Sequence, residues 1–202
     1  MLLTKKKRQE YLRVLGFYKG AIDGIEGSKT KQAYKDLQNT YFFNKKDKDG
    51  KYGTNTDKLL RNAYYVKTYT KNFDLKKELS CECKGKYCTG YPVVYDVNAL
   101  IYLQDVRDEH GSTSVTSAMR CKKLNNSLKG SSKTSRHLDG KAFDFYNSKV
   151  CKNMTTRKAF IDKYICKAKS NYSYCDGYAR SKTGKSYPNA DNMGSCIHID
   201  VK

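Results

Sequence analysis

The chain has 202 residues, 2 prolines and 38% hydrophobic residues, including 18 Tyr and 7 Phe, which excludes collagen-like, mucin-like and fully disordered proteins. Its formal net charge of +20 favours a polyanionic partner, which leaves nucleic acid, an anionic membrane or an anionic cell wall. No stretch approaches the roughly 18 to 20 apolar residues that span a bilayer, and residues 5–8 are charged where a secretory signal would be apolar. We therefore expect no membrane insertion and no signal peptide.

The first predicted elements are a helix and two copies of a turn followed by a helix. Residues 5–15 form a short amphipathic run that ends at a glycine. The run DGIEGSKT at 23–30 returns as DGKYGTNT at 49–56, and each copy leads into a helical pattern. The Asp-Gly pair supplies a tight turn, and Ser28 or Thr54 can cap the helix that follows. The sequence thus predicts a small helical unit at the start of the chain.

This unit resembles the peptidoglycan-binding repeat domain, a three-helix module common in cell-wall hydrolases. The segment from Gly16 to Gln38 matches its run of Gly-aromatic-x-x-Gly-x-x-Asp-Gly-x-x-Gly, followed by a helix that ends in Leu-Gln. The resemblance implies a peptidoglycan-binding helical domain over residues 1–68, whereas a generic helical domain without a ligand is the alternative. Residues 64–76 lack helical periodicity, so we expect a linker there and a boundary near 66–73.

All eight cysteines lie after residue 80, so the second part of the chain differs in composition from the first. An even number suits four disulfides in an extracellular protein, and sequence alone cannot rank the possible pairings. Disulfides or free thiols are the expectation. As the alternative, Cys81-x-Cys83-x4-Cys88 with Cys121 can hold a structural zinc ion, although this spacing matches no standard zinc knuckle.

The second part of the chain begins with a predicted helix and strand. The helix runs from Asp96, as N-cap, to Gly111, which stops it, and the run SVTSAMR at 114–120 reads as a strand that enters a turn. A second strand is predicted over 142–146, where Ala, Asp and Tyr alternate with Phe. The last strand is the run CIHIDVK at 196–202.

Two of the three histidines flank or occupy these strands. His137 precedes the strand that contains Asp144, and an Asp-Gly turn between them can bring the two side chains together. His198 and Asp200 share one face of the last strand because strand side chains alternate. Two imidazoles and one carboxylate leave the fourth position of a tetrahedral zinc ion to water, as in hydrolytic sites, although histidines in strands are also often purely structural.

These segments resemble a known enzyme family. The run SRHLDGKAFDF at 135–145 is similar to the Ser-x-His-x-x-Gly-x-Ala-x-Asp motif of the zinc D-Ala-D-Ala carboxypeptidases and endopeptidases, the M15 peptidases, and the last strand is similar to their closing His-x-Asp segment. The resemblance implies that His137, Asp144 and His198 are the zinc ligands. The order of the two motifs along the chain also agrees with the family.

The resemblance also implies catalytic residues. The run SAMR ends at Arg120 and resembles the family's Ser-Gly-Tyr-Arg element, which implies that this arginine binds the substrate carboxylate or stabilises the oxyanion. Several branches carry an acidic residue three positions before the last histidine, where this chain has Ser195. Asp200 is therefore the first candidate for the general base or for the residue that orients His198, and Asp191 is a weaker candidate for the base.

Together the resemblances predict an α+β protein in which the helical domain precedes a mixed α+β zinc peptidase domain, with a central antiparallel sheet, over residues 69–202. They imply an endolysin-like peptidoglycan hydrolase that cuts a D-Ala-directed stem-peptide or cross-link bond. An L-alanyl-D-glutamate endopeptidase and a non-catalytic wall-binding protein are alternatives, and nucleic-acid binding rests on charge alone. A phage lysin would stay in the host cytoplasm until it is released to the wall, with non-classical export as the other route.

Overall fold

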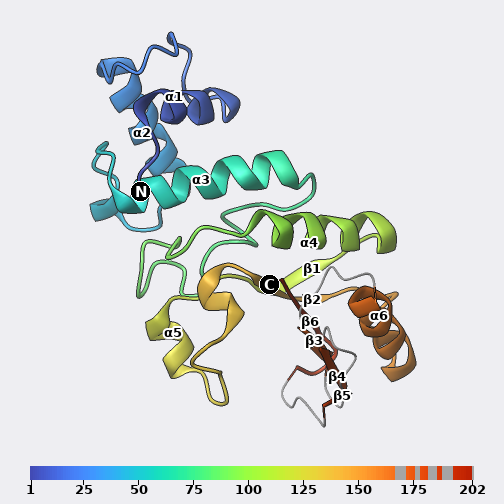
Figure 1. The fold of residues 1–202 in the computed structure, drawn as a ribbon. Coiled ribbons are helices and arrows are strands. Elements are labelled where there is room, and N and C mark those ends of the chain that lie inside the picture. The colour runs from blue at the N-terminus through green and yellow to red at the C-terminus, as the bar shows by residue number, and fades with distance from the viewer. Residues whose placement is uncertain (167–171, 176–177, 182–185, 188–192, 202) are drawn as a thin grey trace.

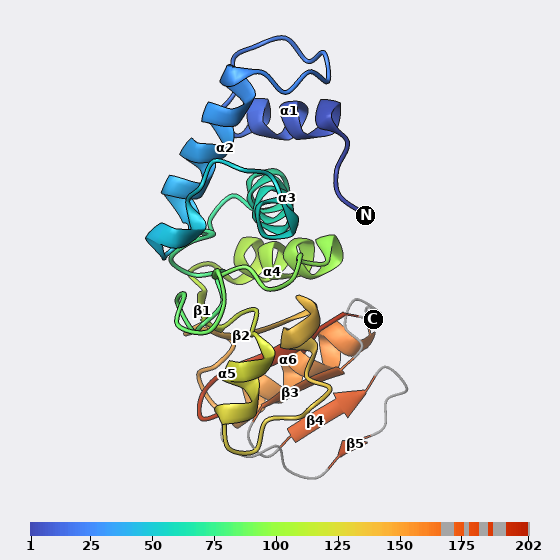
Figure 2. The same ribbon diagram turned by 90° about the vertical axis from the view of Figure 1, so that its left-hand side faces the viewer.

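The computed structural model describes residues 1–166, 172–175, 178–181, 186–187 and 193–201 of the chain (Figure 1). The described residues form an α+β protein, as predicted. Three helices precede a fourth, and this fourth helix lies between them and an antiparallel sheet (Figure 2). Among the described residues, no helix combines the length and the apolar character needed to cross a membrane.

Helices dominate the first half of the chain, and strands enter after residue 110. The helices are α1 (Lys5–Val14), α2 (Ser28–Tyr41), α3 (Thr54–Tyr69), α4 (Val97–His110), α5 (Lys122–Ser127) and α6 (Met154–Cys166), with short 3₁₀ helices η1 (Lys45–Asp47) and η2 (Arg136–Asp139). The strands are β1 (Ser114–Ser117), β2 (Ala142–Tyr146), β3 (Tyr172–Cys175), β4 (Tyr178–Ser181), β5 (Ser186–Tyr187) and β6 (Ile197–Asp200).

The two Asp-Gly turns of the repeat are built in the same way. Gly24 and Gly50 have φ angles of 78° and 74°, a backbone region that glycine adopts without strain. The backbone N–H of Gly24 donates to Gln9 Oε1 at 2.8 Å, and that of Gly50 donates to Gln38 Oε1 at 2.6 Å. Both glutamine side chains are fully buried, so a buried hydrogen bond connects each turn to the preceding helix.

Two expectations about the helical part are wrong. Gly27 and Gly53 precede α2 and α3 as N-caps, so Ser28 and Thr54 are the first helical residues and make no capping hydrogen bond. The expected linker is also helical at its start, since α3 continues to Tyr69. Packing explains this extension because α3 residues lie against α1 and α4, which outweighs a weak local pattern.

The described strands form one antiparallel sheet in the order β1-β2-β6-β3-β4-β5, which confirms the predicted sheet. β2 and β6 are neighbours, although more than fifty residues separate them in sequence. Phe143 stacks on Tyr95 with ring centroids 5.2 Å apart, and Phe145 meets Phe160 of α6 edge to face. Since side chains alternate along a strand, Asp144 points to the opposite face of the sheet.

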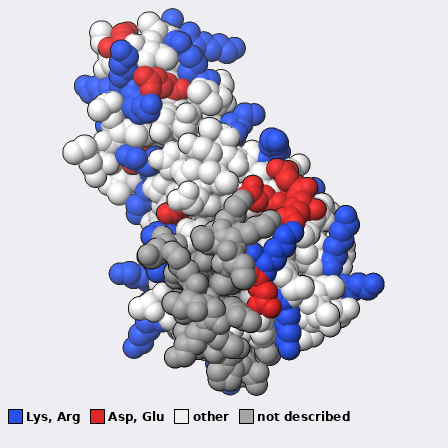
Figure 3. All heavy atoms as spheres, turned by 45° about the vertical axis from the view of Figure 1, so that its right-hand side comes forward, with Lys and Arg blue, Asp and Glu red and all other residues white. Residues whose placement is uncertain are grey.

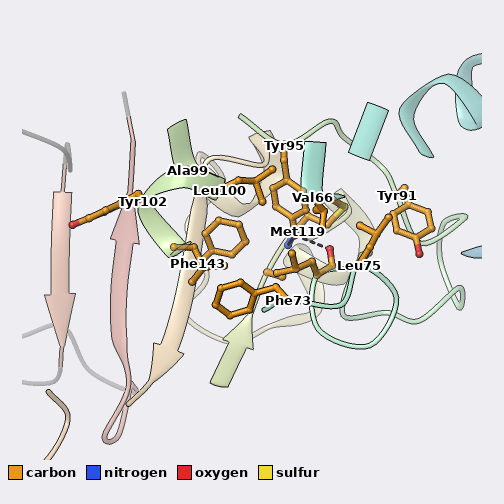
Figure 4. Close-up of a cluster of buried hydrophobic side chains, with 14 of the residues drawn as sticks. Val66, Phe73, Leu75, Tyr91, Tyr95, Ala99, Leu100, Tyr102, Met119 and Phe143 are labelled. Carbon is orange, nitrogen blue, oxygen red and sulfur yellow. Dashed lines mark hydrogen bonds between the residues drawn. The ribbon is translucent and has the colours of Figure 1, made fainter. Parts of the chain in front are cut away.

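A single hydrophobic core joins the helical part to the sheet. Val66 of α3, Tyr95, Leu100 of α4, Met119 and Phe143 of β2 all lie within it (Figure 4). α3 packs on α4, the first helix of the second part. The domain boundary near residue 68 therefore stays a prediction.

Positive charge is distributed over both parts of the molecule. Residues 1–66 contain fifteen basic and seven acidic residues, a net charge of +8. The rest of the chain carries the other +12 of the total charge of +20, so both parts are basic. On the face in Figure 3, Lys and Arg side chains lie over the upper and the lower regions and form no single patch. The positive charge is therefore not confined to one basic arm.

Candidate metal centre

Three side chains predicted as metal ligands converge on one face of the sheet. The ligand atoms of His137, Asp144 and His198 all lie within 4.8 Å of one another. Asp144 and His198 are paired directly across β2 and β6, which places His198 Nδ1 2.6 Å from Asp144 Oδ1. All three residues are buried, at 2%, 7% and 5% exposure.

The turn before β2 places His137, the third candidate ligand, beside Asp144. His137 lies in η2, and Gly140 ends this short helix with a φ of 68°. A Cβ atom on Gly140 would approach the carbonyl oxygen of Val94 to 2.7 Å, so only glycine fits at this position. The turn brings His137 Nε2 to 3.3 Å from Asp144 Oδ1.

The hydrogen bonds of His137 leave one nitrogen directed at the cluster. Its Nδ1 lies 2.6 Å from the carbonyl oxygen of Ala118, which can only accept, so Nδ1 carries the proton. In the neutral ring, the form that binds a metal ion, Nε2 then holds a lone pair, and it is buried without a hydrogen-bond partner among the described residues. A buried lone pair beside a carboxylate and a second imidazole fits a metal ion, because burial without a partner is costly.

His198 is fixed from its opposite side. Its ring stacks on Tyr174 with centroids 4.5 Å apart, and its Nε2 lies 3.5 Å from Asp200 Oδ2. Nδ1 therefore faces Asp144, and Asp200 lies behind the ring. A carboxylate in this position orients a histidine ligand and raises its basicity.

The buried charges alter two pKa values in the cluster. Burial alone would raise the pKa of Asp144, but attraction to His137 and His198 and the hydrogen bond from His198 hold it well below its usual range. Burial alone would lower the pKa of His198, but hydrogen bonds and attraction from Asp144 and Asp200 raise it to about 9. A metal ion at this site must displace the His198 proton at neutral pH.

Arg120 borders the cluster through the same carboxylate. Its Nη2 lies 3.4 Å from Asp144 Oδ2, and its backbone N–H donates to the carbonyl oxygen of His137 at 3.0 Å. Glu82 accepts from Arg120 Nε at 3.0 Å and from the Ser117 hydroxyl at 2.5 Å. The guanidinium is thus held between two carboxylates beside the candidate ligands.

Sequence reasoning missed Glu82. It lies 38 residues before Arg120, between two cysteines, and no spacing rule connects it to the histidines. One pattern in the sequence could have indicated it. Glu82 lies between Cys81 and Cys83, and Arg120 directly precedes Cys121, so a metal site that joined these cysteines would bring Glu82 next to Arg120.

Three positions bear on the general base: Ser195, where several branches of the family have an acid, and the two candidates Asp191 and Asp200. Ser195 is exposed in the turn before β6, and a hydroxyl does not accept a proton readily at neutral pH. Asp191 lies outside the described residues. Asp200 is next to the cluster, but its contact is with the far nitrogen of His198.

Two histidines and an aspartate converge on one face of the antiparallel sheet, beside an arginine. This is the donor set of a metal-dependent hydrolase. The family model described as Peptidase M15 matches residues 69–176, more than half of the chain, so the chain belongs to this family of metallopeptidases. The match includes His137 and Asp144 and ends before His198 and Asp200, which the sheet brings to the same place. No curated protein and no solved structure matches the chain.

Proposed function

We propose that this protein is a peptidoglycan hydrolase that cuts a D-Ala-directed stem-peptide or cross-link bond with the help of a zinc ion held by His137, Asp144 and His198. The observation that carries the proposal is the convergence of these three ligand atoms in a protein of the Peptidase M15 family. Two imidazoles and one carboxylate favour zinc over Mg²⁺ or Ca²⁺, which prefer oxygen ligands. Three protein ligands also leave a coordination position open.

The residues around the ligands have separate tasks in this proposal. When bound, zinc would lower the pKa of a water molecule and polarise the scissile carbonyl. Ala118 holds the His137 ring through Nδ1, and Asp200 holds the His198 ring through Nε2. We assign Asp200 to this positioning role because its carboxylate faces the nitrogen that points away from Asp144.

Arg120 is proposed to bind an anionic group of the substrate. Its guanidinium lies beside Asp144, so a peptide carboxylate bound to it would lie next to the candidate metal position. The planar fork of arginine binds carboxylates through two parallel hydrogen bonds. Glu82 and Ser117 fix the orientation of this fork through Nε and Nη2.

The helical part is proposed to hold the cell wall. A groove of about 710 Å³ is lined by residues of α2 and of the second Asp-Gly turn, and Glu26, Lys31, Lys35 and Tyr52 are among its lining residues. Mixed charges and an aromatic ring suit a sugar polymer that carries peptide carboxylates. The net charge of +20 would keep the protein on an anionic, insoluble wall. An endolysin that is released from the host cytoplasm to the wall is the cellular role that we propose with this activity.

Mass spectrometry of soluble products tests the proposal. Purified peptidoglycan is incubated with zinc-loaded protein, with chelated protein, and with a His137→Ala variant. Release of free D-Ala, or of cross-link fragments that end in D-Ala, supports the D-Ala-directed reaction. Both controls should release none of these products.

Two other outcomes assign a different function. New amino-terminal D-Glu ends would identify an L-alanyl-D-glutamate endopeptidase with the same ligands. Folded protein that binds walls but yields no metal-dependent product would contradict the hydrolase. That result would leave a non-catalytic wall-binding protein, an alternative that rests on Ser195 where several branches of the family have an acid.

A further inference from the structure

A second group of metal-ligating side chains lies apart from the histidine cluster. We propose that Cys81, Cys83, Cys88 and Cys121 bind a structural zinc ion through four thiolates. Their four sulfur atoms lie within 4.8 Å of one another, although Cys121 is more than thirty residues from the others in sequence. This proposal does not rest on the catalytic function proposed above.

The sulfur geometry favours a metal over disulfides. A tetrahedral zinc ion with bonds of about 2.3 Å to sulfur holds its ligands about 3.8 Å apart. Cys83 and Cys88 have their sulfurs 3.4 Å apart, much further than the roughly 2.05 Å of a disulfide. The seven cysteines whose side chains the structure describes are all free, and four of them gather in one group and not in two pairs.

Three of these cysteines lie in one loop, and the backbone of this loop turns so that their sulfur atoms lie close together. Lys84 and Gly85 have φ angles of 45° and 88°, and these two left-handed residues reverse the chain between Cys83 and Cys88. The Cys81 N–H closes the loop by donating to the Gly90 carbonyl at 2.7 Å. The Gly90 N–H donates to Cys88 Sγ at 3.4 Å, a bond that stabilises a thiolate ligand.

The surroundings are rich in positive charge. Four thiolates and one Zn²⁺ carry a net charge of −2, which a basic environment offsets. Lys84 and Lys86 lie in the loop, and Lys122 and Lys123 directly follow Cys121. The ammonium groups of Lys86 and Lys123 both lie about 5 Å from the ring centre of Tyr87, within the same loop.

The proposed ion would fix residues of the candidate active site. Glu82 lies between two of the ligands, and Arg120 directly precedes Cys121. These two side chains are joined by the 3.0 Å bond beside Asp144. A zinc ion bound to their neighbours would therefore hold both ends of this ion pair.

The same loop is packed against the helical part. A Cβ atom on Gly85 or Gly90 would meet Phe43 at 2.6 or 2.8 Å, and Asn44 Nδ2 donates to the Gly85 carbonyl at 2.9 Å. The proposed ion thus stabilises the point where the helical part, the cysteine loop and the arginine meet.

Metal content measured by mass spectrometry of the native protein tests the proposal. After purification without chelator from zinc-supplemented medium, we expect two zinc ions per wild-type chain and one in His137→Ala. Cys88→Ser should lose one ion, whereas Cys196→Ser, which changes a half-buried cysteine outside the group, should keep both. If His137→Ala retains no zinc, the four-cysteine site is contradicted whatever the enzyme assay shows.

Cobalt substitution gives a second readout that does not depend on the folding of a cysteine variant. Co²⁺ bound to the His137→Ala protein should give the strong near-ultraviolet sulfur-to-metal bands of a tetrathiolate. Absence of these bands, or four thiols that react with a disulfide reagent at the rate of Cys196 in zinc-supplemented protein, would overturn the proposal. Tightly bound iron in place of zinc would also overturn it, because the proposal names zinc.

Discussion

His137 and His198 approach Asp144 through different ring nitrogens, and a different group holds each ring from behind. A backbone carbonyl of Ala118 fixes His137, whereas the carboxylate of Asp200 faces His198. The carbonyl fixes only the tautomer, but the carboxylate also stabilises positive charge on the ring. The two ligands are therefore expected to respond differently when their supports are changed.

Replacement of Asp200 by asparagine tests its positioning role. Asp200→Asn keeps the shape of the side chain but removes the charge behind His198, so zinc affinity should fall about 10-fold to 100-fold. Competition with a chelator measures the affinity, and the rate at saturating zinc should change much less. If the variant keeps its affinity and loses its rate at saturating zinc, Asp200 is the proton acceptor.

Asp57 gives the helical part a pH-dependent stability. Its carboxylate accepts from the Leu3 N–H, the Tyr52 hydroxyl and Arg61 Nε at 2.6 to 2.7 Å. Burial alone would raise the pKa of Asp57, but these bonds lower it below its usual value. The stabilisation is present above the unfolded pKa of about 4 and is lost as pH falls through the lower folded pKa.

Urea unfolding at two pH values measures this contribution. At pH 7, Asp57→Asn should lower the free energy of unfolding by about 1 to 3 kcal/mol. Near pH 3 the difference from wild type should be smaller, because Asp57 of the unfolded wild-type chain is then largely protonated and folding gains less from its ionised form. A difference that stays equal at both pH values would show that Asp57 is not ionised in the fold.

Among the structural elements, the repeated turn gives the helical part its shape. In each copy a buried glutamine of the preceding helix accepts from the turn glycine. The third residue of the next helix, Thr30 or Thr56, donates through its hydroxyl to a carbonyl of the turn. The two copies thus use equivalent bonds around Gln9 and Gln38. These bonds satisfy turn groups that would otherwise be buried without partners.

Loss of one glutamine should destabilise the protein strongly. Gln38→Ala leaves the Gly50 N–H without its acceptor and removes one of the two donors to the Lys51 carbonyl, and we expect a cost of about 3 kcal/mol. Gln32→Ala is the matched control. This glutamine of the same helix is exposed and, among the residues that the structure describes, its side chain bonds only Asp36, so the change should cost less than about 0.5 kcal/mol. Chemical denaturation compares the two variants, and equal costs would contradict the role of the turn network.

The sequence predicts those elements whose signals are local. α4 begins after Asp96, whose side chain accepts from the Asn98 N–H at 2.8 Å, and ends at Gly111, as expected. Alternation of side chains along β2 and β6 also predicts the faces of Asp144 and His198. Glu82, the extension of α3 and the convergence of four cysteines depend on contacts between distant segments, which no local pattern contains.

At the scale of the molecule, the helical part and the sheet share one core. Asn62 of α3 is fully buried, donates to the Val93 carbonyl at 2.8 Å and accepts from the Tyr95 N–H at 2.8 Å. Tyr95 in turn stacks on Phe143 of β2. One side chain therefore connects the third helix to the strand that carries Asp144.

Truncation of this side chain should affect both parts together. Asn62→Ala removes the partner of the buried Tyr95 N–H and of the part-buried Val93 carbonyl, which should cost about 2 to 4 kcal/mol. We expect hydrogen–deuterium exchange to accelerate in α2 and in β2 by similar factors, because both unfold as one cooperative unit. Faster exchange in α2 with unchanged exchange in β2 would show that residues 1–68 unfold as a domain of their own.

Anomalous diffraction at the zinc absorption edge, from crystals grown with zinc, tests directly whether the three ligands hold a metal ion. We expect a peak within bonding distance of His137 Nε2, Asp144 Oδ1 and His198 Nδ1, and the peak should vanish in Asp144→Ala. A second peak among the four cysteines would serve as an internal standard for occupancy. Full density for these three side chains without an anomalous peak between them would contradict a metal-dependent peptidase.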